Sequence, residues 1–172
     1  MTSGKTIPSD YDHYIKAASE EYLPTLDWRL LKAQYWVESR LDPHAISPAG
    51  AKGIAQFMPG TWEQVCATLP YTHLEIFDPL PSIAGGAWYM AYLMRQWHLK
   101  RPSIDRHCLA LASYNAGLAH ILQAQVWSDG KLDYARIIQQ LPVVTGKYAE
   151  ETINYAPKIW QTYIEIVSEH AE

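Results

Sequence analysis

With 172 residues, the chain has the length of one domain and can bury a sizeable hydrophobic core without a partner. Its net charge of −4 comes without a cluster of Lys or Arg, which excludes the basic surface typical of nucleic-acid-binding proteins. The two cysteines, Cys66 and Cys108, and the seven histidines show no metal-binding or redox spacing, so we expect free thiols, no metal and no cofactor.

Residues 1–16 are polar and lack the apolar segment of a signal peptide. No apolar run approaches the length that spans a membrane. The sequence therefore predicts synthesis in a reducing cytoplasm without an export signal, no stable membrane insertion, and a monomer.

A first helix is predicted over residues 10–22, because apolar side chains recur there at helical spacing: Tyr14, Ala17, Ala18 and Tyr22. A second helix follows over residues 28–40, and Thr25 or Asp27 can cap its start. This helix should end near Leu41, because Pro43 disfavours helical backbone at the residue before it.

The second helix carries a carboxylate on its apolar face. Steps of three, four and three residues place the following side chains on one side of it: Trp28, Leu31, Tyr35 and Glu38. A carboxyl among rings holds its proton to higher pH, since burial disfavours the charged form. That environment suits a general acid. The alternative is a structural ion pair of Glu38 with Arg40 or Lys52.

Residues 42–60 contain three prolines and three glycines and little periodicity, which predicts a long irregular loop. Apolar residues interleaved in this loop indicate that it is ordered beside the second helix: Ile46, Ile54, Phe57 and Met58. A short hairpin is predicted around residues 50–53.

Further helices are predicted over residues 62–68, 81–97, 103–115, 118–127, 132–141, 147–155 and 157–170. Thr61 with Gln64 reads as a capping box, and Ser103 as another cap. Pro142 should end a helix, and the pair Gly85-Gly86 suggests close approach of another backbone.

These elements predict an all-α fold with at most a small β-hairpin. We expect a lead-in and first helix over residues 1–24, then a catalytic domain over residues 25–172, together forming one globular domain.

Four groups of residues appear in order: W-V-E-S-R with S-P-A-G-A-K-G-I-A-Q-F-M-P-G-T-W, I-A-G-G-A-W-Y-M, A-S-Y-N-A-G, and E-T-I-N-Y-A-P. This order resembles the signature of soluble-type lytic transglycosylases, SLT-domain enzymes with a lysozyme-like helical fold akin to goose-type lysozyme. The resemblance covers about residues 25–163. It departs at Ser82, where the family usually has Asn, and at Ala156, where Val is common.

The resemblance implies that Glu38 is the catalytic acid. It implies that Ser47 and Gln56 hold the substrate's N-acetyl and hydroxymethyl groups, and that Met58 forms a wall of the sugar cleft. The remaining residues that it assigns to substrate binding are Tyr89, Tyr114, Asn115 and Tyr155, the last with its hydroxyl near the acid.

Each of these residues also has a structural interpretation. Ser47 precedes a proline and is a common turn residue. Gln56 can cap a backbone group, and Asn115 before Ala-Gly can end a helix. The three tyrosines can be ordinary core aromatics.

A glycoside hydrolase normally uses two carboxylates. Asp42 and Asp78 are the other candidates, and both read better as loop residues beside proline. The resemblance implies a route with one carboxyl. Glu38 protonates the bond between N-acetylmuramic acid and N-acetylglucosamine, the substrate's N-acetyl group stabilises the anomeric centre, and Glu38 then deprotonates the 6-hydroxyl. The products carry 1,6-anhydromuramic acid ends.

Peptidoglycan glycan strands are thus the expected partner, in the periplasm or cell wall. The alternatives are a muramidase-type hydrolase on the same fold and a non-catalytic peptidoglycan-binding module. Because the sequence shows no export signal, it favours a phage lysis enzyme (endolysin) over a virion-borne or a bacterial enzyme.

Overall fold

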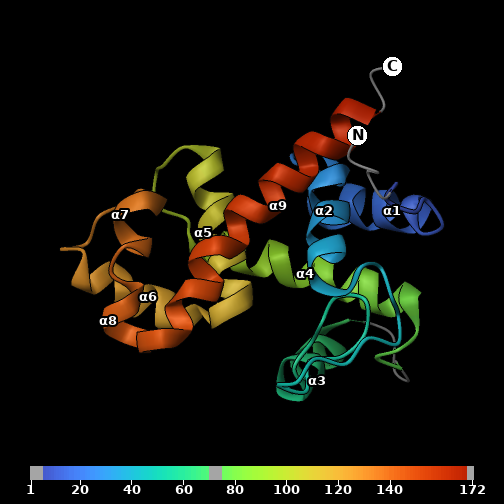
Figure 1. Ribbon diagram of the computed structural model, residues 1–172, viewed down its shortest axis with the longest axis horizontal. Helices are drawn as coiled ribbons and strands as arrows, with labels where there is room; N and C mark the ends of the chain where they lie inside the picture. Colours follow the sequence, from blue (N-terminus) through green and yellow to red (C-terminus); the bar gives the residue numbers. More distant parts are fainter. Residues whose placement is uncertain (1–5, 70–74, 170–172) are drawn as a thin grey trace, which may run out of the picture. The chain divides into compact units, whose positions relative to one another are not determined.

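The computed structural model describes residues 6–69 and 75–169 (Figure 1). Their elements are α1 Asp12–Tyr22, α2 Trp28–Ser39, α3 Pro59–Thr68, α4 Pro79–Gln96, α5 Ser103–Ala116, α6 Leu118–Trp127, α7 Tyr134–Ile138, α8 Leu141–Thr145, the short 3-10 helix η1 Gly146–Tyr148, and α9 Ala149–Glu169. Over these residues the chain has no β-strand, which confirms the all-α prediction. The predicted hairpin is reduced to two isolated bridges, Ile46–Lys52 and Lys52–Phe57.

The chain divides into two compact units. The first contains the described residues up to Tyr89 together with those from Trp160 onward, and the second is Met90–Ile159. Both α4 and α9 therefore contribute residues to each unit. The predicted division into residues 1–24 and 25–172 stays a prediction. In the described ranges, no helix combines the length and apolar character needed to cross a bilayer.

In the first unit, α1 packs on α2, and Ile15 is fully buried. The predicted apolar face of the first helix is wrong, because Tyr14 and Ala17 are exposed. The buried stripe is instead Ile15, Ala18 and Ser19, at the i, i+3, i+4 spacing that places side chains over one another. The aliphatic Ile15 is fully buried, whereas Tyr14 remains at the surface beside the ring of His13, with ring centroids 3.7 Å apart.

Of the two predicted caps of α2, Thr25 and Asp27, it is Asp27 that occupies the cap position. Its carboxylate accepts a hydrogen bond from the backbone N–H of Arg29 at 3.0 Å. The helix ends at Ser39, two residues before the predicted position. Arg40 and Leu41 both adopt left-handed backbone, with φ of 59° and 61°. Such conformations are unfavourable for L-residues. Burial of the Leu41 side chain, which is only 5% exposed, helps to hold this turn and directs the chain into the loop.

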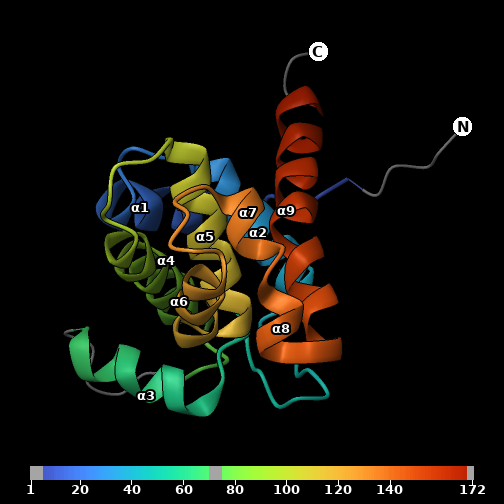
Figure 2. The same cartoon turned by 90° about the vertical axis from the view of Figure 1, so that its left-hand side faces the viewer.

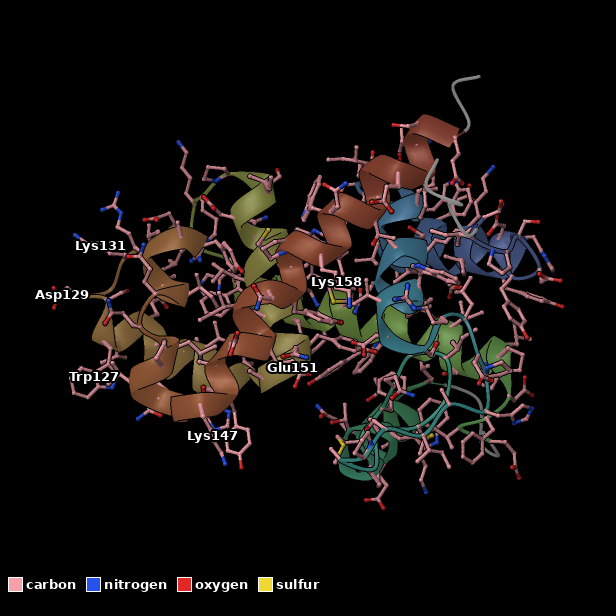
Figure 3. All side chains as sticks on the ribbon, in the orientation of Figure 1. Trp127, Asp129, Lys131, Lys147, Glu151 and Lys158 are labelled. Atoms are coloured by element: carbon pink, nitrogen blue, oxygen red, sulfur yellow. The ribbon has the colours of Figure 1, made fainter. Side chains whose placement is uncertain are left out.

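In the second unit, α5 packs against α6 and α7, and α6 packs against α8 (Figure 2). The predicted bounds of α6 are confirmed at both ends. Its buried residues are Ile121 and Ala124, whereas Trp127 is 57% exposed and projects from the ribbon in Figure 3. The indole N–H of Trp97 donates to the Ser113 hydroxyl at 3.1 Å and ties the end of α4 to α5.

Two predicted caps are wrong. The third helix begins at Pro59 rather than residue 62, with Met58 at the N-cap, so Thr61 lies inside the helix and forms no capping box. Ser103 is the first residue of α5, and Pro102 occupies the cap position. Proline fits the first turn of a helix because the N–H that it lacks has no partner there.

The same reason explains the error at Pro142, which stands in the first turn of α8 rather than ending a helix. The predicted helix over residues 132–141 is therefore the shorter α7, followed by α8. Two final helices were predicted, over residues 147–155 and 157–170. The structure instead has the short η1 followed by one continuous helix, α9, with the exposed Pro157 inside it. The predicted end of this helix at residue 170 lies outside the described residues.

Candidate active site

Glu38 lies in the last turn of α2 and is half-buried. One turn earlier on the same face, Tyr35 is completely buried, and Leu31 is 3% exposed. The predicted apolar face is therefore present, with Glu38 at its outer end. Glu38 thus stands where the core meets solvent, a position from which a carboxyl can reach a bound ligand.

Tyr35 lies in the core, one helical turn before Glu38. Its hydroxyl donates to the backbone carbonyl of Ile83 in α4 at 2.7 Å, which fixes α2 against α4. Burial raises the pKa of Tyr35 well above its ordinary value, and the negative charge of Glu38 raises it further. The phenol therefore stays neutral, and its ring is a fixed support one helical turn below Glu38.

The paired glycines of α4 explain how Tyr35 fits. A Cβ on Gly86 would lie 2.3 Å from the Tyr35 hydroxyl oxygen, and a Cβ on Gly85 would lie 2.9 Å from Cγ1 of Val65. The close approach predicted from these glycines is present, but it is made by side chains rather than by another backbone. Gly86 leaves the space that the Tyr35 ring occupies.

Two serines fasten the loop to the helices around Glu38. Ser39 donates its hydroxyl to the carbonyl of Ile54 at 2.8 Å. Ser82 of α4 is fully buried, and its hydroxyl accepts from the N–H of Ala55 at 3.3 Å. Ser82, at the position where the resembled family usually has Asn, still holds the loop. Neither serine was predicted to have this role, and adjacency to Glu38 was the only signal for Ser39.

Ser47 and Gln56 shape the loop itself. The Ser47 hydroxyl accepts from the N–H of Ala51 at 3.0 Å, as expected of a turn residue. Gln56 has left-handed backbone, with φ of 53°, and its side-chain N–H₂ donates to the carbonyls of Gly53 at 2.8 Å and Ala45 at 3.2 Å. The structural interpretation of both residues is therefore correct. Gln56 retains its amide oxygen as an acceptor for a ligand, and Ser47 retains its hydroxyl hydrogen as a donor.

Met58 follows the buried Phe57 in the chain, and Tyr89 lies beside the Phe57 ring. Met58 is 46% exposed, so it presents an apolar surface to solvent. The Phe57 ring lies 5.2 Å from the Trp62 ring and 6.3 Å from the Tyr89 ring, between centroids. Tyr89 is half-buried. Both predicted residues thus lie in the first unit with Glu38, Ser47 and Gln56.

The two other candidate carboxylates have local structural roles. Asp42 accepts from the backbone N–H of His44 at 2.8 Å, and Asp78 accepts from that of Leu80 at 3.1 Å. Both side chains are exposed. These are turn and helix-start interactions, as predicted, and they leave Glu38 as the carboxyl placed at an apolar surface.

The remaining predicted residues belong to the second unit. Tyr114 is half-buried, and Tyr155 is 5% exposed. Asn115, near the end of α5, accepts from the Thr152 hydroxyl at 2.6 Å and donates to the Glu151 carboxylate at 3.2 Å. Asn115 therefore joins α5 to α9, in addition to lying near the helix end.

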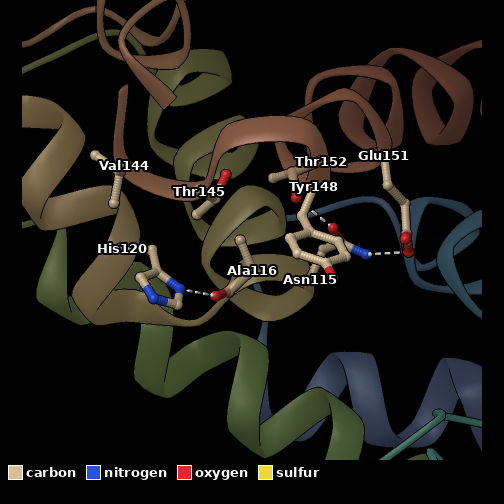
Figure 4. Close-up of a pocket in the computed structure, with 8 residues that line it drawn as sticks. All are labelled: Asn115, Ala116, His120, Val144, Thr145, Tyr148, Glu151 and Thr152. Atoms are coloured by element: carbon tan, nitrogen blue, oxygen red, sulfur yellow. Dashed lines mark hydrogen bonds between the residues drawn. The ribbon is translucent and has the colours of Figure 1, made fainter. Parts of the chain in front are cut away.

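A cavity of about 440 Å³ opens beside Asn115 in the second unit (Figure 4). It lies between the end of α5, the start of α6, α8 with η1, and the first turn of α9. The sequence predicted only Asn115 among the residues that line it.

The described residues contain no cluster of three or more His, Cys, Asp or Glu arranged to hold a metal ion. Both cysteines are free thiols, as predicted, with Cys108 buried and Cys66 half-buried.

Comparison with known proteins gives one matching family model, the transglycosylase SLT domain, over residues 13–137. The chain is similar to the membrane-bound lytic murein transglycosylase F of Pectobacterium atrosepticum, with 34% identity over 143 residues, covering 80% of this chain and 28% of the relative. The same-named protein of Pseudoalteromonas translucida is 39% identical over 107 residues, covering 62% and 22%. The chain therefore spans less than a third of these relatives.

Solved structures with a similar fold include the 70 kDa soluble lytic transglycosylase from Escherichia coli, with a TM-score of 0.70 and 24% identity, covering 91% of this chain and 24% of that one. A complex of the 70 kDa soluble lytic transglycosylase with bulgecin A gives a TM-score of 0.76 at 23% identity, covering 96% and 25%. These likenesses confirm the predicted lysozyme-like helical fold.

Proposed function

The chain belongs to the transglycosylase SLT domain family, and from that premise we propose that it is a peptidoglycan lytic transglycosylase with Glu38 as its catalytic residue. The observation that carries the proposal is the position of Glu38, half-buried at the end of α2 above the fully buried Tyr35. The loop that follows is fastened beside it by Ser39 and Ser82.

In the first proposed step, the Glu38 carboxyl donates its proton to the glycosidic oxygen between N-acetylmuramic acid and N-acetylglucosamine. The bond from the anomeric carbon to that oxygen breaks, and the N-acetylglucosamine side leaves as an alcohol. The substrate's own N-acetyl oxygen stabilises the positive anomeric carbon. This step needs no second carboxylate, which agrees with the local roles of Asp42 and Asp78.

In the second step, the ionised Glu38 takes the proton of the muramic acid 6-hydroxyl while that oxygen attacks the anomeric carbon. A 1,6-anhydro bond forms, Glu38 regains its proton, and no water is consumed. One carboxyl can serve both steps, because the first step leaves it as the base that the second step needs.

The other family-matched residues are proposed to bind the glycan. The hydroxyl hydrogen of Ser47 and the amide oxygen of Gln56 remain after the loop's own hydrogen bonds, so they would contact the N-acetyl and hydroxymethyl groups. Met58 would form an apolar wall, as its exposure allows. Further substrate contacts are proposed for Tyr89, Tyr114, Asn115 and Tyr155.

Digestion of purified sacculi followed by mass spectrometry of the fragments tests this proposal. Muramic acid ends lighter by one water than lysozyme products are the expected result. Reducing muramic acid ends would instead identify a muramidase on the same fold. Binding to sacculi without release of fragments would identify a non-catalytic peptidoglycan-binding module.

The biological setting is a separate part of the proposal. The relatives named above come from bacteria and are described as membrane-bound. For this chain we propose a phage lysis role instead. The chain would then act on peptidoglycan outside the cytoplasm after passing through a membrane pore. Expression in bacteria with and without a phage pore protein tests this, and lysis only with the pore supports it. No lysis in either strain would contradict it.

A further inference from the structure

Two of the buried side chains of α2 end in a nitrogen, those of Lys32 and Gln34. The Lys32 ammonium has a counter-ion, because it lies 2.6 Å from the carboxylate of Asp12. Gln34 is 1% exposed, and its side-chain nitrogen, Nε2, is buried without a hydrogen-bond partner. A buried donor that water does not reach costs free energy while it stays unpaired, so its presence in a native fold needs a reason.

Gln34 lies one helical turn before Glu38 and on the same side of α2. Side chains of an α-helix lean toward its N-terminus, so the Glu38 side chain extends back over positions 34 and 35. The Cβ atoms of residues four apart are about 5–6 Å from each other, and glutamine can donate to an acidic side chain at this spacing. The unpaired nitrogen of Gln34 is therefore a donor that the Glu38 carboxyl can reach.

Tyr35, the other residue under Glu38, has no hydrogen left to give. Its hydroxyl donates to the carbonyl of Ile83 at 2.7 Å. Burial raises the pKa of Tyr35, and the negative charge of Glu38 raises it further, so the carboxyl of Glu38 lies within electrostatic reach of this ring. The carboxyl thus lies toward the buried end of its face, where Gln34 offers a donor and Tyr35 does not.

We propose that Gln34 is a positioning residue, whose side-chain N–H donates to the Glu38 carboxylate once that group has given its proton to the glycosidic oxygen. The inference rests on the proposed function. A hydrogen bond to an ionised acceptor is stronger than one between neutral groups, so the bond strengthens in the first step. It holds the carboxylate in place until the carboxylate takes the proton of the 6-hydroxyl. Gln34 itself transfers no proton.

Other titratable or charged groups lie on the elements around Glu38 in the first unit. Arg40 places its guanidinium 4.8 Å from the centre of the Trp36 ring, and Asp42 accepts from the backbone of His44. The remaining groups are Lys52 in the loop, Tyr89 on α4, Asp12 on α1, which is paired with Lys32, and Tyr163 on α9, which donates to Asp27 at the start of α2. All of them are kept when only residue 34 is changed, so a difference between two titrations reports on the amide.

Gln34→Met tests the proposal, because methionine has a similar length and can be buried but has no donor. The titration of the Glu38 carboxyl is followed by carbon NMR and assigned by its loss in Glu38→Gln. We expect the pKa of Glu38 to rise by about one pH unit, since a donor to the charged form is removed. Gln96→Met is the control: this half-buried glutamine of α4 donates to the carbonyl of Tyr92, and its loss should not change the titration. An unchanged titration in Gln34→Met, or the same change in both variants, would overturn the proposal.

A second measurement needs no substitution at residue 34. In the unchanged protein, the side-chain N–H resonances of Gln34 should move with pH together with the titration of Glu38. In Glu38→Gln this movement should be absent. Resonances that stay constant through the titration of Glu38, or that move equally in Glu38→Gln, would show that the amide does not bond to the carboxylate.

Turnover of sacculi distinguishes positioning from a structural role. Gln34→Met should lower kcat about tenfold with KM unchanged, and the alkaline limb of kcat/KM should move to higher pH by about the same one pH unit. A lower kcat with the limb in its original place would indicate a structural role only and would overturn the proposal. If the unchanged protein forms no anhydro ends, the proposed function fails, while the two NMR titrations still decide about the hydrogen bond.

Discussion

The loop around Glu38 and the cavity around Asn115 use their polar side chains in different ways. In the loop, Ser82 and Gln56 bond to backbone groups and so fix the path of the chain. In the cavity, Asn115 and Thr152 bond to other side chains and so fix the direction of a carboxylate. The first arrangement holds the loop beside the proposed acid, Glu38, whereas the second fixes the direction of Glu151 at the cavity. Residues of the family motifs, such as Gln56 and Asn115, can therefore stabilise the fold whether or not they also bind substrate.

The largest expected effect comes from replacing Glu38, the proposed acid. Glu38→Gln preserves the shape of the side chain but removes the proton that is transferred, so we expect kcat on sacculi to fall about a thousandfold or more. Thermal unfolding should be unchanged. Release of anhydromuropeptides at near the original rate would exclude Glu38 as the acid.

Each unit buries titratable groups, among them Tyr35 in the first and His107 in the second. Burial lowers the pKa of His107 to about 4, below the ordinary value of 6.5. Between these two pH values the unfolded chain binds a proton that the folded protein does not, so stability falls as pH falls. The contribution is about 3 kcal/mol by pH 4.

Urea unfolding at pH 7, 5.5 and 4 measures this loss. His107→Leu should flatten that part of the pH dependence, whereas replacing the exposed His98 by Gln should leave it unchanged. Identical pH dependence in the unchanged protein and in the His107 variant would show that this histidine does not contribute.

In the first unit, Gly86→Ala should destabilise the fold by about 1–3 kcal/mol, because the new Cβ would lie 2.3 Å from the oxygen of the fully buried Tyr35. The helix propensity gained by alanine, about 1 kcal/mol, does not offset this clash. Gly60→Ala is the control, since a Cβ there meets no atom within 4 Å. Chemical denaturation of the two variants should move in opposite directions.

Ser82→Ala tests whether the loop needs the hydrogen bond between the N–H of Ala55 and the Ser82 hydroxyl. Loss of the acceptor for the buried N–H of Ala55 should cost about 1 kcal/mol in unfolding free energy and lower kcat, because the loop beside Glu38 would loosen. Ser168→Ala, at an exposed serine of α9, should leave both unchanged. A loss of stability at Ser82 without any change in kcat would show that the loop keeps its path without this bond.

Local signals in the sequence predicted some elements well. The bounds of α6 were correct because Gly117 precedes it and a Ser-Asp-Gly turn follows it. Prolines misled at two helix starts: Pro59 was placed in the loop and Pro142 at the end of a helix, whereas both lie in the first turn of a helix. Whether a proline ends a helix or begins one depends on the backbone conformation of the residues before it. The residue types around the proline do not determine that conformation.

Hydrogen bonds between residues far apart in the chain could not be predicted from local sequence patterns. Ser82 bonds to a backbone N–H 27 positions earlier in the chain, and Asn115 bonds to side chains 36 and 37 positions later. Serine and asparagine side chains can form such bonds with many partners, so their identity alone does not select one. The position of Glu38 on the apolar face of α2 was predictable, because helical spacing brings its neighbours together within eleven residues.

The contact between Tyr35 and Gly86 has a consequence for evolution and for protein engineering. Of the three nearest contacts that an alanine at position 86 would make, the shortest is to the phenolic oxygen, and the other two are to ring carbons. Phenylalanine at position 35 removes the shortest contact, so the two positions should tolerate change as a pair better than singly. A mutational library of this protein should therefore randomise residues 35 and 86 jointly, and relatives with a larger residue at 86 should carry a smaller side chain at 35.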